Sequence, residues 1–302
     1  MPSFRAAPVR VRVPATSANL GPAFDCAGLA LGLYDEVVVR VADSGVHVDV
    51  AGEGAEDLPR DKRHLVVKAL RAGFDALGGQ PRGIEVVCAN RIPQSRGLGS
   101  SSGAIVAAVL AARALVLGGD QRLDDDAALD LATQLEGHPD NVAACLRGGL
   151  TLAWTDTAGV HVHRADVHPD IVPIAFVPAT RASTMKVRRL LPASVPHAAA
   201  AANSARAALL SLAMTTTPTL LLAATEDRLH QSYRASAMTR SAALVDELRT
   251  AGIPAVISGA GPTVLALATD LTADAVLARD VRGWKVLRLP VEVGGASVLP
   301  LR

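Results

Sequence analysis

The sequence predicts an α+β protein with two domains. Its 302 residues exceed what a single core usually fills. Short β-branched segments are interleaved with longer segments of helical spacing, which in the second half favours a sandwich with a largely antiparallel sheet. Near the middle, the polar segment Asp166–Asp170 contains Pro169 and interrupts the pattern. We therefore expect one domain over residues 1–165 and another over residues 166–302.

Composition limits the classes of partner. Half of the residues are hydrophobic but only 3% are aromatic, so the cores must be built from Ala, Val, Leu and Ile. With 30 basic and 29 acidic residues, nothing in the charge favours nucleic acid or a membrane surface. The apolar runs are too short to span a bilayer, and the N-terminus lacks a signal-peptide core. Three isolated cysteines suggest neither disulfides nor a metal knuckle. We expect a cytoplasmic protein.

The first elements follow from local patterns. Valines alternating with arginines over Val9–Val13 predict a half-buried strand, and the turn-rich segment Pro14–Asp25 predicts a long loop. Gly78 and Gly79 form a good C-cap for a helix that begins at His64. Further strands are expected at Leu33–Val41, Val46–Val50 and Gly83–Ala89.

A glycine-rich loop, Arg96–Gly103, follows the third of these strands. Ile92-Pro93 cannot continue a helix before it, and the apolar segment Ala104–Ala112 predicts a buried helix after it. Unpaired N–H groups at a helix start are a natural seat for phosphate, and glycines let the backbone approach closely. An ordinary capped core helix has the same local pattern, so these residues alone leave both interpretations open.

The remaining elements complete the α+β pattern. Asp124–Asp126 cap a helix that runs to Leu135, and Glu136–Asn141 leads into a short helix ended by Gly148-Gly149. A hairpin is expected over Leu150–His163. The second half should contain strands and helices as follows: strands Ile171–Val177, Ile253–Ser258, Thr263–Ala268 and Trp284–Leu289; helices Thr184–Leu191, His197–Met214, Thr219–Met238, Ser241–Ala251 and Thr272–Arg279.

Three common phosphate-binding classes are excluded. The chain contains no Gly-Lys step, which a P-loop requires. Ser102 stands where a dinucleotide-binding fingerprint needs its third glycine. The HRD and DFG signatures of protein kinases are absent.

Three segments together resemble the GHMP kinase superfamily of small-molecule kinases: Pro14–Asp25, Pro93–Ser101 and Ser258–Thr263. Within it, Glu136–Asn141 and Leu229–Arg234 make the chain most similar to homoserine kinases of the actinobacterial type. The resemblance implies a two-domain fold, with an N-terminal domain like ribosomal protein S5 domain 2 and a C-terminal ferredoxin-like sandwich. It also implies ATP-dependent phosphorylation of a small alcohol.

The resemblance assigns ATP to the glycine-rich loop, with the third segment completing the site. The ATP-binding positions are Pro93, Ser95, Arg96, Gly97, Leu98, Gly99, Ser100, Ser101, Ser102 and Gly103, supported by Gly259, Gly261 and Thr263. It implies Mg²⁺ held by Ser100 or Ser101 with Glu136, a donor set that suits a cation keeping waters and phosphate oxygens. The alternative for Glu136 is a solvent-facing carboxylate at a helix end.

For L-homoserine, the resemblance places Asp25 at the ammonium with Asn19 beside it, and Arg188 and Arg234 at the carboxylate. Planar guanidinium groups match a carboxylate in a bidentate manner. The alternative for either arginine is a surface position, and Arg189 could replace Arg188.

His138 and Asn141 match positions that line the substrate in the family. The catalytic set is therefore Asn141, Ser101 and Glu136. We expect direct attack of the hydroxyl on the γ-phosphate, oriented by Asn141 and without a strong side-chain base; Asp140 is the nearest acidic candidate for one.

Three functions remain open from the sequence. The first is a homoserine kinase using ATP and Mg²⁺, and the family likeness suggests a homodimer. The second is a related GHMP kinase for another small alcohol, in which Arg188 and Arg234 would not clamp an α-carboxylate. The third is a non-catalytic nucleotide-binding protein on the same fold, against which Ser101, Glu136 and Asn141 argue.

Overall fold

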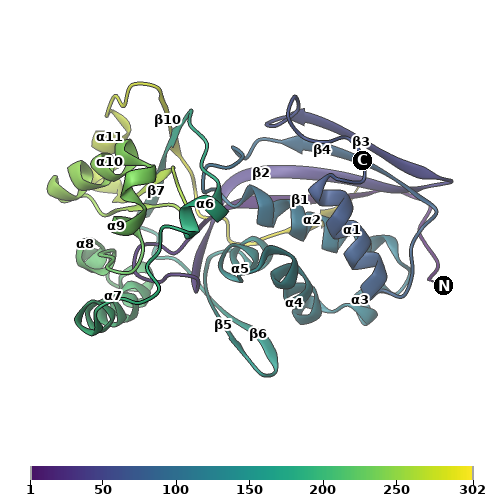
Figure 1. Cartoon of the computed structure of the whole chain (residues 1–302), viewed down its shortest axis with the longest axis horizontal. Coiled ribbons are helices and arrows are strands. Elements are labelled where there is room, and N and C mark those ends of the chain that lie inside the picture. Colours follow the sequence, from purple (N-terminus) through teal and green to yellow (C-terminus); the bar gives the residue numbers. More distant parts are fainter. Residues whose placement is uncertain (1, 301–302) are drawn as a thin grey trace.

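The computed structural model describes residues 2–300, which form two sheets with helices packed on them (Figure 1). The first sheet has seven strands, in the order β11-β1-β2-β4-β3 with the β5–β6 hairpin attached to β2. Only β3 and β4 pair in parallel. The strand bounds are β1 Val9–Ala18, β2 Ala27–Ala42, β3 Gly45–Gly52, β4 Gly83–Asn90, β5 Leu150–Asp156, β6 Gly159–Ala165 and β11 Ser297–Leu299.

Helices cover one face of this sheet, and α2 lies at their centre. The helices are α1 Leu65–Ala76, α2 Ser100–Leu115, α3 Gly119–Arg122, α4 Asp125–Glu136 and α5 Asp140–Arg147. The continuous apolar run of α2 is buried nearly throughout, as expected for a helix that is hydrophobic on all sides. Its first residue, Ser100, lines a cavity together with Thr184, Arg188 and Gly259 of the second half.

The second sheet has four antiparallel strands in the order β10-β7-β9-β8. Its strands are β7 Ile171–Pro178, β8 Ala255–Ile257, β9 Val264–Thr269 and β10 Trp284–Arg288. The helices of this half are α6 Thr184–Arg188, α7 His197–Thr215, α8 Leu221–Ala224, α9 Gln231–Arg234, α10 Thr239–Thr250 and α11 Asp270–Leu277. Within residues 2–300, no helix has the length and apolar character needed to cross a membrane.

The two halves share a hydrophobic core, so they are packed together rather than loosely tethered. Leu20 and Leu98 from the first half lie in one buried cluster with Ile171, Ala175 and Leu265 from the second. The sheets change over between β6 and β7, and β11 then returns to pair with β1. We propose the domain boundary at residues 166–170, between 1–165 and 166–302, with the last strand crossing back to the first sheet.

Two sequence predictions about secondary structure are wrong. The predicted helix Thr219–Met238 is broken between α8 and α9, because the buried Asp227 carboxylate accepts hydrogen bonds from the amides of Leu229, His230 and Gln231. Such a side-chain turn competes with helix hydrogen bonding. The predicted loop Pro14–Asp25 begins as strand, because β1 pairs with β2 as far as Ala18, past a bulge after Pro14.

Candidate active site

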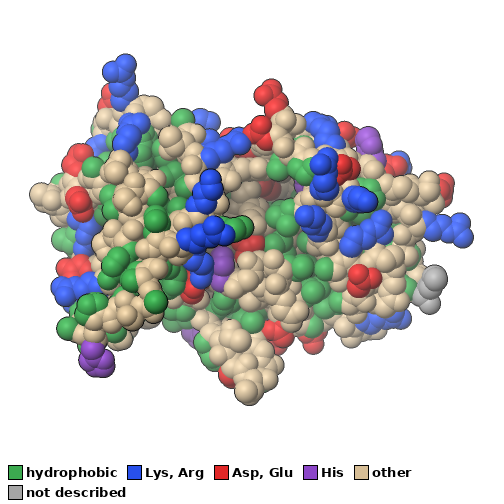
Figure 2. All heavy atoms as spheres, viewed as in Figure 1, with side chains coloured by type: hydrophobic (Ala, Val, Ile, Leu, Met, Phe, Trp, Pro, Cys, Tyr) green, Lys and Arg blue, Asp and Glu red, His purple; other side chains and the backbone are tan. Residues whose placement is uncertain are grey.

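A cavity of about 240 Å³ lies between the two halves and collects most of the predicted site residues. Figure 2 shows a hollow there, with basic side chains along its edge. The predicted residues on its wall are Asn19, Asp25, Ser95, Gly97, Leu98, Gly99, Ser100, Ser101, Glu136, His138, Asn141, Arg188, Arg234 and Gly259. The predicted residues that do not line it are Pro93, Arg96, Ser102, Gly103, Gly261 and Thr263.

The glycine-rich loop forms a tight turn directly before α2. Ser95, Gly97 and Gly99 all have positive φ, between 57° and 77°. Gly99 is the N-cap of α2, and no side chain within residues 2–300 caps the helix there. The first amides of a 16-residue helix are therefore available at the cavity wall, which makes an anion seat.

Residues outside the cavity hold this loop from behind. The Ser258 hydroxyl donates to the carbonyl of Gly97 at 2.6 Å, and the Thr263 amide donates to the carbonyl of Arg96 at 3.2 Å. The Arg96 guanidinium donates to the carbonyls of Gln94, Pro178 and Ala179. Thr263 and Arg96 are thus engaged in fixing the loop to the second half.

We expect Gly99→Ala to raise the KM for ATP by about tenfold or more, because a Cβ there would lie 1.9 Å from the Thr16 hydroxyl oxygen. Gly118→Ala is the matched control: its φ is also +70°, but the nearest atom to an added Cβ is 3.5 Å away. Steady-state kinetics of both variants separates backbone strain from the clash. Equal ATP kinetics in the two variants would contradict the proposed packing.

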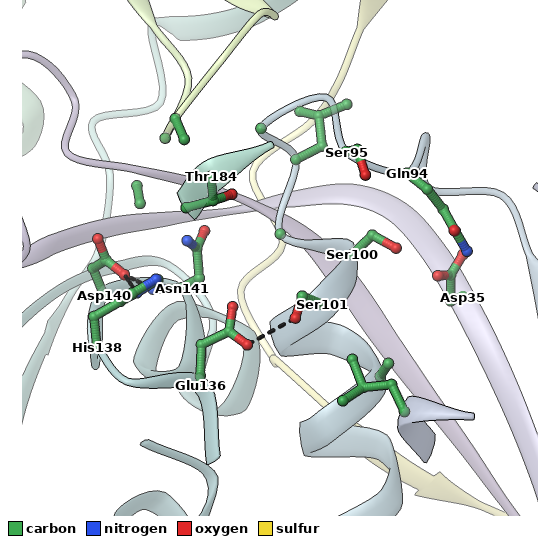
Figure 3. Close-up of a pocket in the computed structure, with 18 of the residues that line it drawn as sticks. Asp35, Gln94, Ser95, Ser100, Ser101, Glu136, His138, Asp140, Asn141 and Thr184 are labelled. Atoms are coloured by element: carbon green, nitrogen blue, oxygen red, sulfur yellow. Dashed lines mark hydrogen bonds and ion pairs between the residues drawn. The ribbon is translucent and has the colours of Figure 1, made fainter. Parts of the chain in front are cut away.

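Glu136 sits at the end of α4 and contacts the start of α2. Its two carboxylate oxygens each accept a hydrogen bond of 2.8 Å, one from the Ser101 hydroxyl and one from that of Ser102. Figure 3 shows Ser101 pointing toward Glu136 and Ser100 pointing away from it. Glu136 is half-buried.

The donor set around Glu136 is compatible with Mg²⁺. Within residues 2–300, no three His, Cys, Asp or Glu side chains converge as a ready-made metal site. One carboxylate beside one hydroxyl at the anion seat is nevertheless what a phosphate-bound Mg²⁺ needs from a protein, since its other ligands are phosphate oxygens and waters.

The turn after Glu136 brings three polar residues to the cavity. Asp140 is only 2% exposed, and its Oδ1 lies 2.6 Å from His138 Nδ1 while accepting from the Asn141 amide at 2.7 Å. The hydrogen bond to Asp140 raises the pKa of His138, against the opposing effect of burial. Asp140 lines the cavity as well, and its Oδ1 is the oxygen that holds His138 and the Asn141 amide. Asn141 Oδ1 accepts from the Thr16 hydroxyl at 2.8 Å.

The opposite wall carries the acid and the arginines. Arg188 donates to both carboxylate oxygens of Asp25, at 2.8 and 2.7 Å. Arg234 is 3% exposed and its Nε has no partner within the described residues. Burial, followed by the nearby positive charge of Arg188, lowers the pKa of Arg234. Both guanidinium groups lie over the Phe24 ring, 5.5 and 5.1 Å from its centre.

Asn19 is predicted as a substrate residue, and the structure uses its amide internally. Its Oδ1 accepts from the Asp25 amide at 2.9 Å, and its Nδ2 donates to the carbonyl of Gly259 at 3.0 Å. Both Asn19 and Asp25 have positive φ, a conformation that Asn and Asp tolerate better than most residues. Asn19 therefore holds Asp25 in place and links it to the third motif.

Sequence reasoning missed Phe24, His64 and Asp35, which line the cavity, and Thr16, which is fully buried next to the glycine-rich loop. Thr16 lies within the segment Pro14–Asp25, and Phe24 directly precedes Asp25, but neither carries a local signal of its role. His64, which the sequence leaves unassigned, caps α1 and is 3% exposed, and its Nε2 has no partner within residues 2–300. Asp35 is a buried acid in an apolar strand, and it accepts from the amides of Arg91 and Ile92 before the loop.

Burial raises the pKa of Asp35 from 3.8 to about 6. A raised folded-state pKa stabilises the fold below the unfolded value, and that stability is lost as pH rises through the folded value. We expect the free energy of unfolding to fall by about 3 kcal/mol at most between pH 4 and pH 6 on this account. Asp35→Asn should flatten the profile in urea titrations, whereas the surface control Asp280→Asn should not. An unchanged slope in Asp35→Asn would contradict the assignment.

Comparisons with known proteins establish the family of this chain. The family model described as "GHMP kinases N terminal domain" matches residues 64–149, and "GHMP kinases C terminal" matches residues 205–283. Homoserine kinase of Streptomyces avermitilis is 64% identical over 300 residues, which cover 99% of this chain and 98% of that protein. Homoserine kinase of Streptomyces coelicolor is also 64% identical, over 99% of this chain and 97% of its own length.

Among solved structures, homoserine kinase from Cytophaga hutchinsonii has a TM-score of 0.80 at 25% identity, covering 99% of each chain. Leishmania major mevalonate kinase, with 18% identity and a TM-score of 0.71, shares the fold. These matches confirm the predicted α+β class and GHMP-kinase-like fold. The chain belongs to the homoserine kinase family of the GHMP kinase superfamily.

Proposed function

We propose that this protein transfers the γ-phosphoryl group of ATP to the side-chain hydroxyl of L-homoserine, giving O-phospho-L-homoserine and ADP on the route to threonine. One observation carries the proposal beyond the family relationship. A single cavity joins an anion seat on one wall to a carboxylate and two arginines on another. That second set is complementary to the ammonium and carboxylate of an amino acid.

In this proposal, ATP lies with its phosphates on the amides of Gly97–Ser101. Its base extends toward the apolar end of the cavity, which Val37, Leu58 and Val66 line. Ser101 and Glu136 hold Mg²⁺, which supplies charge neutralisation for the phosphates. Ser101 is preferred to Ser100 because its hydroxyl already meets Glu136 at 2.8 Å.

L-Homoserine separates the Asp25–Arg188 ion pair and binds both partners. Its ammonium pairs with the Asp25 carboxylate in place of Arg188, and its carboxylate pairs with Arg188 and the buried Arg234. A substrate with both charges satisfies both protein groups when the pair opens, whereas a substrate with one charge leaves the other group unpaired. This exchange favours amino acids over simple alcohols. His138, beside Asp140, lines the path between this wall and the loop.

Transfer is direct. The homoserine hydroxyl oxygen forms a bond to Pγ as the bond from Pγ to the bridging oxygen of ADP breaks. Asn141 orients the hydroxyl and no side chain acts as a strong base; Asp140 Oδ1 is engaged by His138 and by the Asn141 amide. A loose transition state needs positioning and charge stabilisation more than a strong base.

A coupled ADP-release assay over a panel of alcohols tests the proposal. We expect turnover that depends on L-homoserine, with little on mevalonate. Activity on mevalonate and none on homoserine would favour another GHMP kinase. ATP binding without turnover on any alcohol would favour a non-catalytic nucleotide-binding protein. We further propose that the protein is a homodimer and that it is cytoplasmic. Analytical ultracentrifugation tests the oligomeric state, and cell fractionation tests the location.

A further inference from the structure

A buried threonine in β1 links the two parts of the site that must act together. Thr16 is fully buried and lies 125 positions before Asn141 in the chain. Its hydroxyl donates to Asn141 Oδ1 at 2.8 Å, and its backbone amide donates to the carbonyl of Leu98 at 3.1 Å. One residue therefore contacts both the phosphate loop and Asn141.

The loop is packed directly against the Thr16 hydroxyl. Gly99 leaves no room for a side chain there, since an added Cβ would lie 1.9 Å from Thr16 Oγ1 and 3.3 Å from Asn141 Oδ1. The backbone of Thr16 pairs with Ala30 of β2, and its β-branched side chain has few rotamers. The packing of Gly99, the strand pairing with Ala30 and the restricted rotamers together fix the position of the Thr16 hydroxyl.

This contact determines whether the oxygen or the nitrogen of the Asn141 side-chain amide points into the cavity. Within residues 2–300, Asn141 Oδ1 is the one hydrogen-bond partner of the Thr16 hydroxyl. A flipped amide would leave the hydroxyl proton unpaired in a fully buried position, which is unfavourable. Oδ1 therefore faces Thr16, and Nδ2, which is only a donor, is the group left for the cavity.

We propose that Thr16 is a positioning residue that fixes Asn141 as a hydrogen-bond donor to the reacting hydroxyl oxygen; this rests on the proposed kinase function. Donation to that oxygen leaves a lone pair for Pγ and turns the hydroxyl proton away from Asn141. As the O–Pγ bond forms and ADP leaves, this proton passes to an oxygen of the transferred phosphoryl group. Asn141 never accepts it.

A double-mutant cycle tests the proposal, with Thr16→Val, Asn141→Ala and the combined variant. Thr16→Val should lower kcat by about 10- to 100-fold and change the KM for homoserine by about threefold at most, because the clamp residues are untouched. In the Asn141→Ala background, Thr16→Val should cause no further loss, since its effect passes through Asn141. Thr16→Ser, which keeps the hydroxyl, should restore kcat to within about threefold of the wild-type value.

An unchanged kcat in Thr16→Val, or losses that multiply in the combined variant, would overturn the proposal. So would a Thr16→Ser variant as slow as Thr16→Val, since packing of the methyl group would then explain the loss. Thermal melts check folding, and Thr16→Ala replaces Thr16→Val if the valine variant does not fold. Wild-type protein without homoserine-dependent ADP release would instead refute the proposed function itself.

Discussion

Glu136→Gln should lower kcat by about 100- to 1000-fold and shift the magnesium requirement upward. The amide keeps the size of the side chain and its ability to accept from Ser101, but it removes the negative charge proposed to hold Mg²⁺. A loss of charge at a metal ligand acts mainly on the transition state, where charge builds on the transferred phosphoryl group. Titration of kcat against free Mg²⁺ measures both effects.

Two of the loop serines, Ser101 and Ser102, provide the controls for Glu136. Ser101→Ala should mimic Glu136→Gln in its magnesium titration, because Ser101 is the proposed second ligand. Ser102→Ala removes the other hydrogen bond to Glu136 but leaves a residue that does not line the cavity, so it should change kcat by about threefold at most. A normal magnesium titration in Glu136→Gln would contradict the role of Glu136 as a metal ligand. Its role would then be structural, as the hydrogen-bonded link between α4 and α2.

The phosphate loop could be predicted from sequence because its determinants are local. Glycines allow the positive φ at Gly97 and Gly99, and the helix that follows begins at Ser100, directly after Gly99. Helix ends marked by neighbouring residues were predictable for the same reason: α1 ends at Ala76, directly before Leu77 and the glycine pair. These features depend on residues a few positions apart.

Contacts between distant segments could not be predicted in this way. The sequence predicts Asp227 within a helix. In the structure, its carboxylate accepts hydrogen bonds from three backbone amides. Asn19 and Asp25 were predicted to lie together, but nothing local showed that Arg188 donates to both oxygens of the Asp25 carboxylate. The Thr16–Asn141 contact joins residues 125 positions apart and depends on how two halves of one sheet and its helices pack.

Arg234→Leu should raise the KM for L-homoserine by about 100-fold while leaving the KM for ATP within about threefold. Arg234 is buried against Phe24 and lies near Arg188, so two positive charges converge where the substrate carboxylate is proposed to bind. Leucine fills part of the same volume without a buried charge, and the fold should therefore tolerate it. Steady-state kinetics with each substrate varied in turn measures both constants.

Arg189→Leu is the matched control for Arg234→Leu, because Arg189 is exposed beside Arg188 and does not line the cavity. It should leave both constants near wild-type values, and that result also excludes Arg189 as a substitute for Arg188. An unchanged homoserine KM in Arg234→Leu would contradict the clamp. If Arg234→Leu and Arg189→Leu raised the homoserine KM equally, a general loss of positive charge near the cavity would explain both effects. A specific contact with the substrate predicts an effect at the buried Arg234 alone.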